Sequence, residues 1–219
     1  MLTYKQRFIK FMVQNEVLLF GEFTLKSGRK APYFINAGKY RTGSQIAQLG
    51  EYYAECFLAN GVEAKTLVGP AYKGIPLAVA TAIALSKKHW KDVGYCFDRK
   101  EEKDHGEGGL FVGAKLEAGD SVCIIEDVMT SGKALREILP KIKAEADVNV
   151  SSMIISVDRQ EKGTGEKSAV EEAFDEFGVK VYSIVTMEDI IEAIEEGVIP
   201  GKEYLPAMRE YRKMYGAKR

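Results

Sequence analysis

Short apolar runs alternate with helical stretches along most of this chain. Five such runs follow residue 60, several of them rich in valine and isoleucine, at 65–69, 93–97, 121–127, 151–158 and 180–185. Apolar spacing predicts a helix at about 42–60 and a second, alanine-rich helix that ends at about residue 87. Three further helices are predicted at about 132–144, 168–177 and 187–196. Such alternation indicates a parallel sheet covered by helices on both faces. We therefore expect an α/β fold with functional residues at the carboxyl ends of the strands.

The two ends of the chain depart from this rhythm. Residues 3–14 place apolar side chains near one face, which predicts a short helix. Residues 18–38 carry apolar residues in short bursts, with Ser27 and Gly28 between them, which predicts a hairpin or a small sheet. The stretch 208–219 is locally basic and is typical of a solvated terminal helix.

The connection 98–120 lies between two predicted strands and shows no helical pattern. Its basic side chains, set beside several glycines, are Arg99, Lys100, Lys103 and His105. Structureless connections longer than about 12–15 residues are uncommon in compact domains and are often lids or binding loops. A solvated disordered loop is the alternative interpretation, and 109–115 fits one arm of a hairpin.

Composition narrows the function classes. The chain has 219 residues, 46% of them hydrophobic, and a formal net charge of -1, so a basic nucleic-acid surface is not indicated. Its cysteines, Cys56, Cys96 and Cys123, show no metal-binding spacing and fit a reducing compartment. The N-terminal stretch lacks the continuous apolar region of a signal peptide, and no run approaches the roughly 18 apolar residues of a membrane span. We expect a cytoplasmic protein with no membrane or nucleic-acid partner.

Two acids end the predicted strand at 121–127. Glu126 and Asp127 are adjacent, so in an extended chain their side chains point to opposite faces, and both cannot easily chelate one metal ion. Buried carboxylates need hydrogen-bond donors, and two vicinal ribose hydroxyls are suitable donors for this pair. A metal ion close to the acids is a further possibility.

A turn of small residues follows the acids. Thr130, Ser131 and Gly132 leave backbone N–H groups accessible at the start of a helix, where the helix dipole favours an anion such as phosphate. Acids for hydroxyls followed by a phosphate pocket describe a 5-phosphoribosyl group. The alternative is an ordinary strand, turn and helix cap with incidental acids. The glycine patterns of nucleotide-binding P-loops and of dinucleotide-binding domains are missing from this chain.

The stretch CIIEDVMTSGKA, at 123–134, resembles the phosphoribosyl-pyrophosphate signature of the type I phosphoribosyltransferase family. Four further segments resemble the orotate-using branch of that family: 20–38 its hood, 69–78 its pyrophosphate loop, 98–109 its mobile catalytic loop and 156–163 the segment after the next strand. Together they cover roughly residues 4–215 in order. The resemblance implies one domain over 1–219, with a hood of about 1–40 plus C-terminal contributions. It also implies a core of about 61–186 built on a central, mostly parallel five-stranded sheet.

The same resemblance implies the reaction. A 5-phosphoribosyl group would pass from phosphoribosyl pyrophosphate to N1 of orotate, giving orotidine 5'-monophosphate and diphosphate in pyrimidine biosynthesis. Mg2+ would be held mainly by substrate oxygens and water rather than by protein ligands. A homodimer whose lid is shared between subunits is also implied. Transfer to another base, or a non-catalytic regulator of the same fold, remains as an alternative.

Site residues carry over from the resemblance position by position. Phosphoribosyl pyrophosphate would contact Lys26, Tyr72, Lys73, Arg99, Lys100, Lys103, His105, Glu126, Asp127, Val128, Met129, Thr130, Ser131, Gly132, Lys133 and Ala134. Orotate would contact Lys26, Phe34, Ile35, Thr130 and Arg159. Lys103 would supply charge to the leaving diphosphate and His105 a proton. Without the resemblance, Arg159 fits a surface ion pair, Phe34 fits hood core and Lys73 fits a solvated loop.

Overall fold

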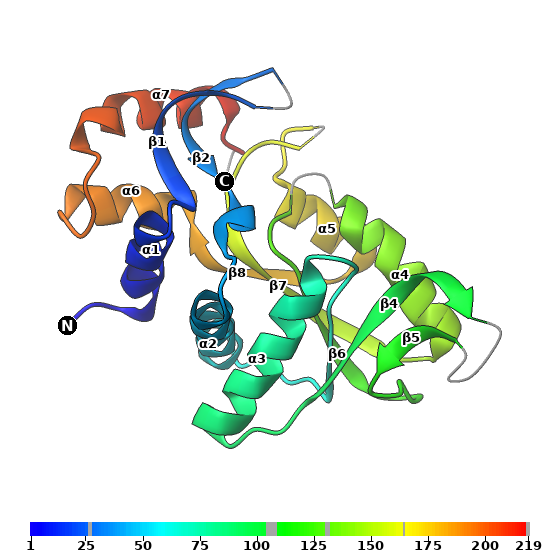
Figure 1. Ribbon diagram of the computed structural model, residues 1–219. Helices are drawn as coiled ribbons and strands as arrows, with labels where there is room; N and C mark the ends of the chain where they lie inside the picture. The colour runs from blue at the N-terminus through cyan, green and yellow to red at the C-terminus, as the bar shows by residue number, and fades with distance from the viewer. Residues whose placement is uncertain (26–27, 104–108, 130–131, 164, 218–219) are drawn as a thin grey trace.

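The structure is a computed structural model that describes residues 1–219 apart from 26–27, 104–108, 130–131, 164 and 218–219, and gives no side chains for 100–103. Its main sheet has the strand order β5-β4-β3-β6-β7-β8. These strands are β3 (Thr66–Val68), β4 (Gly94–Lys103), β5 (Gly109–Gly113), β6 (Ser121–Ile125), β7 (Asn149–Asp158) and β8 (Lys180–Thr186). Helices lie on both faces of this sheet, and a separate hairpin stands over one end (Figure 1).

The five predicted strands are confirmed as one parallel array. Neighbours pair in parallel from β4 through β3, β6 and β7 to β8. The sheet has one strand more than predicted, because β5 adds to the β4 edge in antiparallel orientation. The α/β fold class is therefore confirmed, with a sixth strand.

The prediction that 98–120 lacks regular structure is wrong for the described residues. β4 runs on to Lys103 and turns back as β5, which confirms the hairpin alternative for 109–113. β4 pairs with β3 only from Gly94 to Cys96, so the rest of the strand pairs with β5 alone. The end of β4 consists of charged residues, which can form such an arm. The hydrophobic pattern therefore did not predict that β4 extends to Lys103.

Seven helices lie in the described chain. They are α1 (Tyr4–Gln14), α2 (Gly43–Ala59), α3 (Gly74–His89), α4 (Lys133–Glu145), α5 (Ala169–Phe177), α6 (Met187–Glu195) and α7 (Leu205–Tyr215), with short 3-10 turns η1 (Ala37–Lys39) and η2 (Lys202–Tyr204). Capping boxes begin four of them, for example Thr42 with Gln45 in α2 and Ser168 with Glu171 in α5. No helix in this part of the chain is long and apolar enough to cross a membrane.

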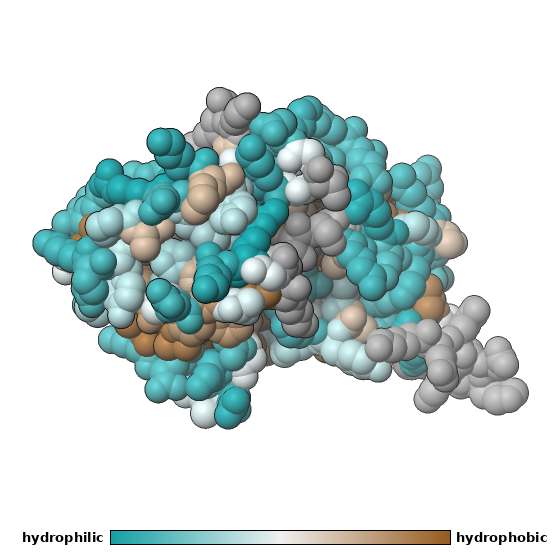
Figure 2. Space-filling model, turned by 90° about the horizontal axis from the view of Figure 1, so that it is seen from above, coloured by the Kyte–Doolittle hydropathy of each residue, from teal (hydrophilic) through white to brown (hydrophobic). Residues whose placement is uncertain are grey.

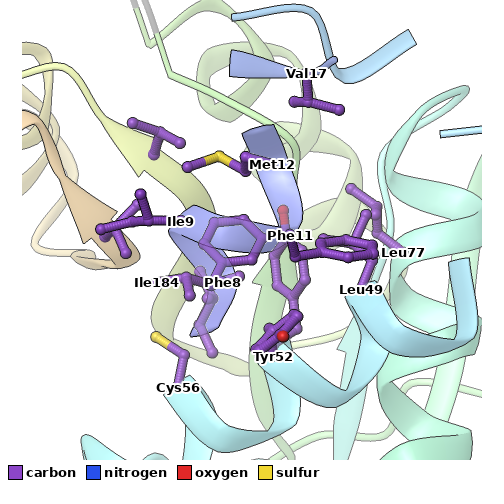
Figure 3. Packing of buried hydrophobic residues seen from close by; sticks show 14 of the residues in the cluster. Phe8, Ile9, Phe11, Met12, Val17, Leu49, Tyr52, Cys56, Leu77 and Ile184 are labelled. Carbon is purple, nitrogen blue, oxygen red and sulfur yellow. The ribbon is translucent and has the colours of Figure 1, made fainter. Parts of the chain in front are cut away.

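Two hydrophobic cores lie on opposite faces of the sheet. Successive residues of β6 alternate between them: Cys123 and Ile125 pack with α1, α2, α3 and α6, whereas Val122 and Ile124 pack with α4 and α5. Aromatic rings fill the first core, where labelled residues of α1 and α2 face one another (Figure 3). This double cover explains why the strands read as unbroken apolar runs.

The hood is an antiparallel hairpin of β1 (Leu18–Thr24) and β2 (Lys30–Ile35), as predicted. α7 packs against β2, with the rings of Tyr33 and Tyr211 at 5.7 Å in an edge-on contact. The prediction of a simply solvated terminal helix therefore needs correction, since Met208 and Tyr211 are buried. Seen from the hood side, hydrophilic residues cover most of the surface (Figure 2).

Candidate active site

The acid pair, Glu126 and Asp127, follows the last residue of β6 and is anchored through its backbone. The N–H of Glu126 donates to the carbonyl of Ile154 at 3.0 Å, and the Tyr53 hydroxyl donates to the carbonyl of Glu126 at 2.7 Å. The Ser156 hydroxyl donates to the carbonyl of Asp127 at 2.6 Å. Neighbouring strands and α2 thus fix the backbone on which both carboxylates stand.

Both carboxylates of the acid pair are buried, at 8% and 9% exposure, yet each has few donors. Glu126 accepts the Asp127 N–H at 2.9 Å, and Asp127 accepts the Val128 N–H at 2.8 Å. Lys73 donates to the second oxygen of Asp127 at 2.7 Å, although its side chain is 67% exposed. The strand ends at Ile125 and Asp127 lies in a bend, so the expectation of opposite faces, which assumed an extended chain, does not apply.

Burial is the main reason that the pKa of Glu126 is raised to about 7, and the negative charge of Asp127 adds to it. A carboxyl group with this pKa is partly protonated near neutral pH. Hydrogen-bond donors or a cation arriving beside it would favour the ionised form. The acid pair is therefore prepared for a ligand that brings donors.

A cavity of about 80 Å³ lies beside the acid pair at the start of α4. It is lined by Val128, Met129, Gly132, Lys133, Ala134, Leu135 and Met153. Gly132 caps the helix with a φ of 67°, a left-handed conformation that favours glycine. Helix N-termini present unpaired N–H groups and suit an anion. Thr130 and Ser131, predicted to complete this pocket, lie outside the described residues.

The loop before α3 reaches the acid pair through Lys73. Gly74 is required there, because a Cβ on it would lie 2.8 Å from the carbonyl oxygen of Ile125. Asp98, which is 6% exposed, accepts the N–H of Ala71 at 2.8 Å and the ammonium of Lys141 at 2.5 Å. Asp98 thereby links this loop to α4, a role that was not predicted from the sequence.

The hood and the end of β7 meet at Glu161. We call the following set the Glu161 cluster: Glu161, Arg159, Tyr33, Tyr211 and Arg29. Tyr33 and Tyr211 donate to one oxygen of Glu161 at 2.8 Å and 3.1 Å, and Arg159 donates to the same oxygen through Nε and Nη2 at 2.9 Å and 2.5 Å. Arg159 is 22% exposed at its side chain, so it is not the surface ion pair of the alternative interpretation.

The acid pair and Arg159 lie at the same edge of the sheet. Val128 forms a parallel bridge with Val157, which places the residue after the acid pair opposite a residue two positions before Arg159. Phe34 is half-buried on β2 with its ring stacked on that of Phe23 at 5.5 Å, and Ile35 pairs with Leu18 in the hood. Tyr33, the residue before Phe34, is a member of the Glu161 cluster.

The remaining predicted residues are placed as follows. Tyr72 is 66% exposed in the loop before α3, Arg99 is half-buried on β4, and Lys133 is exposed at the start of α4. Lys100 and Lys103 lie on β4 with side chains that are not described. Lys26, His105, Thr130 and Ser131 lie outside the described residues.

Within the described residues no group of three His, Cys, Asp or Glu side chains could hold a metal ion. Glu126 and Asp127 still offer the oxygen atoms that Mg2+ prefers. A larger hollow of about 430 Å³ is lined only by residues 197–203 and contains none of the predicted site residues. This hollow therefore adds no residue to the predicted site.

Comparison with known proteins supports the resemblance to the phosphoribosyltransferases. A family model described as "Phosphoribosyl transferase domain" matches residues 40–191. An orotate phosphoribosyltransferase of Clostridium botulinum is 50% identical over 222 residues, which cover 99% of this chain and 99% of that protein. Another, from Salmonella agona, is 49% identical over 216 residues, which cover 99% of this chain and all of that protein.

Solved structures agree with the sequence relatives. The crystal structure of an orotate phosphoribosyltransferase from Francisella tularensis superposes with a TM-score of 0.86 at 40% identity, covering 96% of this chain and 99% of that one. A Mycobacterium tuberculosis orotate phosphoribosyltransferase in complex with 5-phospho-alpha-D-ribosyl 1-diphosphate has a TM-score of 0.62 at 18% identity, over 86% and 99% of the two chains. The second likeness shows the fold alone.

Proposed function

The chain belongs to the orotate phosphoribosyltransferases, and on that premise we propose that the strand-end site carries the family reaction. The 5-phosphoribosyl group passes from phosphoribosyl pyrophosphate to N1 of orotate, and diphosphate leaves. Residues 1–219 act as one domain, with the hood and α7 on the orotate side and the core of about 61–186 on the sugar side. The observation that carries the proposal is the buried acid pair next to a cavity at the start of α4.

The acid pair accepts the ribose hydroxyls, and the cavity receives the 5-phosphate. Glu126 and Asp127 have few donors for buried carboxylates, so two hydroxyl donors would complete their hydrogen bonding. Lys73 pairs with Asp127 while most of its side chain faces solvent, and the same ammonium can turn to the diphosphate. Thr130, Ser131 and the start of α4 supply donors to the phosphate.

The transition state develops positive charge on the ribose and negative charge on the diphosphate. Positioning and electrostatics therefore do most of the work. Tyr72, Lys73, Arg99, Lys100, Lys103 and His105 surround the diphosphate, with Lys103 and His105 stabilising the leaving group. Mg2+, when bound, would be held mainly by substrate oxygens and water and would supply further charge neutralisation. Closure of the segment 98–109 over the substrates would keep water from the activated ribose.

Orotate lies between the hood and the end of β7. Its ring packs near Phe34, with Ile35 offering backbone contacts, and its carboxylate binds Arg159 with help from Thr130. Lys26 reaches between the two substrates. An arginine suits this role because its planar fork matches a carboxylate.

A direct assay tests the proposal. Purified protein is mixed with orotate, phosphoribosyl pyrophosphate and Mg2+, and the loss of orotate absorbance is followed together with the release of diphosphate. Uracil and purine bases replace orotate in parallel reactions. We expect turnover with orotate and with none of the other bases. Turnover with another base would reassign the substrate. Binding of phosphoribosyl pyrophosphate without turnover would favour a non-catalytic regulator.

Assembly and location complete the proposal. A homodimer that shares the lid segment 98–109 is supported by the family resemblance, and sedimentation equilibrium at micromolar concentration tests whether the protein is a dimer. A cytoplasmic location is supported by three free, buried cysteines, which suit a reducing compartment.

A further inference from the structure

Glu161 collects more donors than any single substrate role would require. One of its oxygens accepts from two tyrosine hydroxyls and two atoms of Arg159, all within 3.1 Å, and Arg29 approaches the other oxygen at 3.5 Å. The side chain of Glu161 is only 15% exposed. Oε1 of Glu161 therefore has no capacity left to accept a bond from a ligand, whereas Oε2 carries only the long contact with Arg29.

The donors come from three separate parts of the fold. Tyr33 belongs to the hood strand β2, Tyr211 to the C-terminal helix α7, and Arg159 to the end of β7. Glu161 is thus a single point at which the hood, α7 and the sheet edge are joined. The orotate site proposed above lies where these three parts meet.

The backbone around Glu161 is held independently. The N–H of Lys162 donates to the carbonyl of Tyr215 at 2.8 Å, and the N–H of Ala217 donates to the carbonyl of Gln160 at 2.9 Å. Gln160 also accepts the N–H of Glu188 at 3.1 Å through its side chain. The position of the Glu161 carboxylate is therefore set by the fold and does not depend on a bound substrate.

Arg159 gains its orientation from this carboxylate. Glu161 binds the edge of the guanidinium that is formed by Nε and Nη2. It does not bind the other edge, which is formed by Nη1 and Nη2. An arginine offers both edges to carboxylates, and holding one edge directs the other. Burial lowers the pKa of Arg159, but the charges and hydrogen bonds of Glu161 and Tyr33 together raise that pKa above its usual value.

We infer that Glu161 is a positioning residue that fixes Arg159, and with it the hood, for recognition of the orotate carboxylate. This inference rests on the proposed function, because it assigns Glu161 through the role of Arg159. Glu161 itself touches neither substrate. Its loss should weaken the orotate side of the site and leave the phosphoribosyl side intact.

Steady-state kinetics of Glu161→Gln test the inference, with KM measured for each substrate while the other is saturating. Glutamine keeps the size and one acceptor but removes the charge. We expect KM for orotate to rise about 10- to 100-fold, the scale of a displaced binding group, while KM for phosphoribosyl pyrophosphate stays within about twofold. Equal rises in both KM values would indicate a general loss of structure and overturn the inference.

Two companion variants keep the result interpretable. Glu195→Gln removes a carboxylate from an exposed pair with Arg209 and should change neither KM. Tyr33→Phe removes one donor but keeps the ion pair of Glu161 with Arg159, so it should raise KM for orotate less than Glu161→Gln does. Melting temperatures close to that of the unaltered protein confirm that each variant is folded.

A double-mutant cycle separates the inference from the proposed function. If Glu161 acts through Arg159, Glu161→Gln should change KM for orotate less than about threefold in an Arg159→Ala background. Additive effects would overturn the positioning role alone. An unchanged KM for orotate in Arg159→Ala would instead refute the role of Arg159 in the proposed function, and the role of Glu161 with it.

Discussion

Two acidic regions, one buried and one partly buried, stand at the same edge of the sheet and are built in opposite ways. The acid pair, Glu126 and Asp127, receives two backbone donors and one exposed lysine. Glu161 receives four close donors on one oxygen and a fifth, more distant one on the other. Burial differs little between the two regions, but the supply of donors differs strongly.

The difference separates binding from positioning. A buried carboxylate is costly until its hydrogen bonds are satisfied. A carboxylate with few donors can therefore be completed by a ligand. A carboxylate oxygen that already accepts several hydrogen bonds instead holds the donor groups around it in place. The pKa of Glu126, raised by burial to about 7, fits the first case. The pKa of Tyr33, raised by burial and by Glu161, fits the second, since a protonated hydroxyl stays a donor. Changes on the sugar side should therefore spare the orotate side, and the predictions below test this separation.

The largest effect is expected from a residue of neither region. Lys103 is the last residue of β4, and the resemblance assigns it to the leaving diphosphate. Lys103→Ala should lower kcat about 10²-fold or more, as expected for a major electrostatic contact, and leave both KM values within about threefold. An unchanged kcat would remove Lys103 from the mechanism.

Asp127→Asn should weaken the sugar side. The change removes the charge that pairs with Lys73 and that accepts a ribose hydroxyl in the proposed function. Charge-assisted hydrogen bonds contribute about 1.5–3 kcal/mol, so KM for phosphoribosyl pyrophosphate should rise roughly 10- to 100-fold. KM for orotate should stay within about threefold, and the comparison fails if both rise together.

Asp98→Asn should give a similar but smaller change. Asparagine can still accept the N–H of Ala71 but loses the charge that holds Lys141, so the loop carrying Lys73 is less firmly placed. We expect KM for phosphoribosyl pyrophosphate to rise about tenfold, within the range for a lost charge-assisted bond. Asp175→Asn is the matched control, because Asp175 pairs with Lys167 at 2.5 Å on the exposed surface and should leave KM unchanged.

The smallest effect is a pH dependence. Ribose hydroxyls and Mg2+ favour the ionised form of Glu126, so affinity for phosphoribosyl pyrophosphate should rise as pH passes upward through about 7 and level off above it. Titration calorimetry should show that affinity for phosphoribosyl pyrophosphate rises between pH 6 and pH 8 by about fivefold more in the unaltered protein than in Glu126→Gln. The pH dependence that remains in Glu126→Gln reports the ligand's own ionisation. Identical profiles for both proteins would show that Glu126 does not titrate on binding.

Local signals in the sequence were enough for the parallel strands and for the position of the acid pair. Apolar runs marked five strands, and Glu126 and Asp127 do lie directly after the last residue of β6. One arm of the β4–β5 hairpin was expected at 109–115, but the extension of β4 to Lys103 was missed because its pairing with β5 needs no apolar pattern. Glu161 was missed because its hydroxyl partners lie 128 and 50 residues away along the chain, and no local spacing reveals such a meeting. Asp98 was missed for the same reason.

The most direct measurement is a crystal structure of the protein with phosphoribosyl pyrophosphate and Mg2+. We expect ribose hydroxyl oxygens within hydrogen-bond distance of Glu126 and Asp127, and the 5-phosphate in the cavity at the start of α4. Arg159 should keep its contact with Glu161, as in the unliganded chain. A sugar bound away from both carboxylates, or a phosphate outside that cavity, would contradict the account.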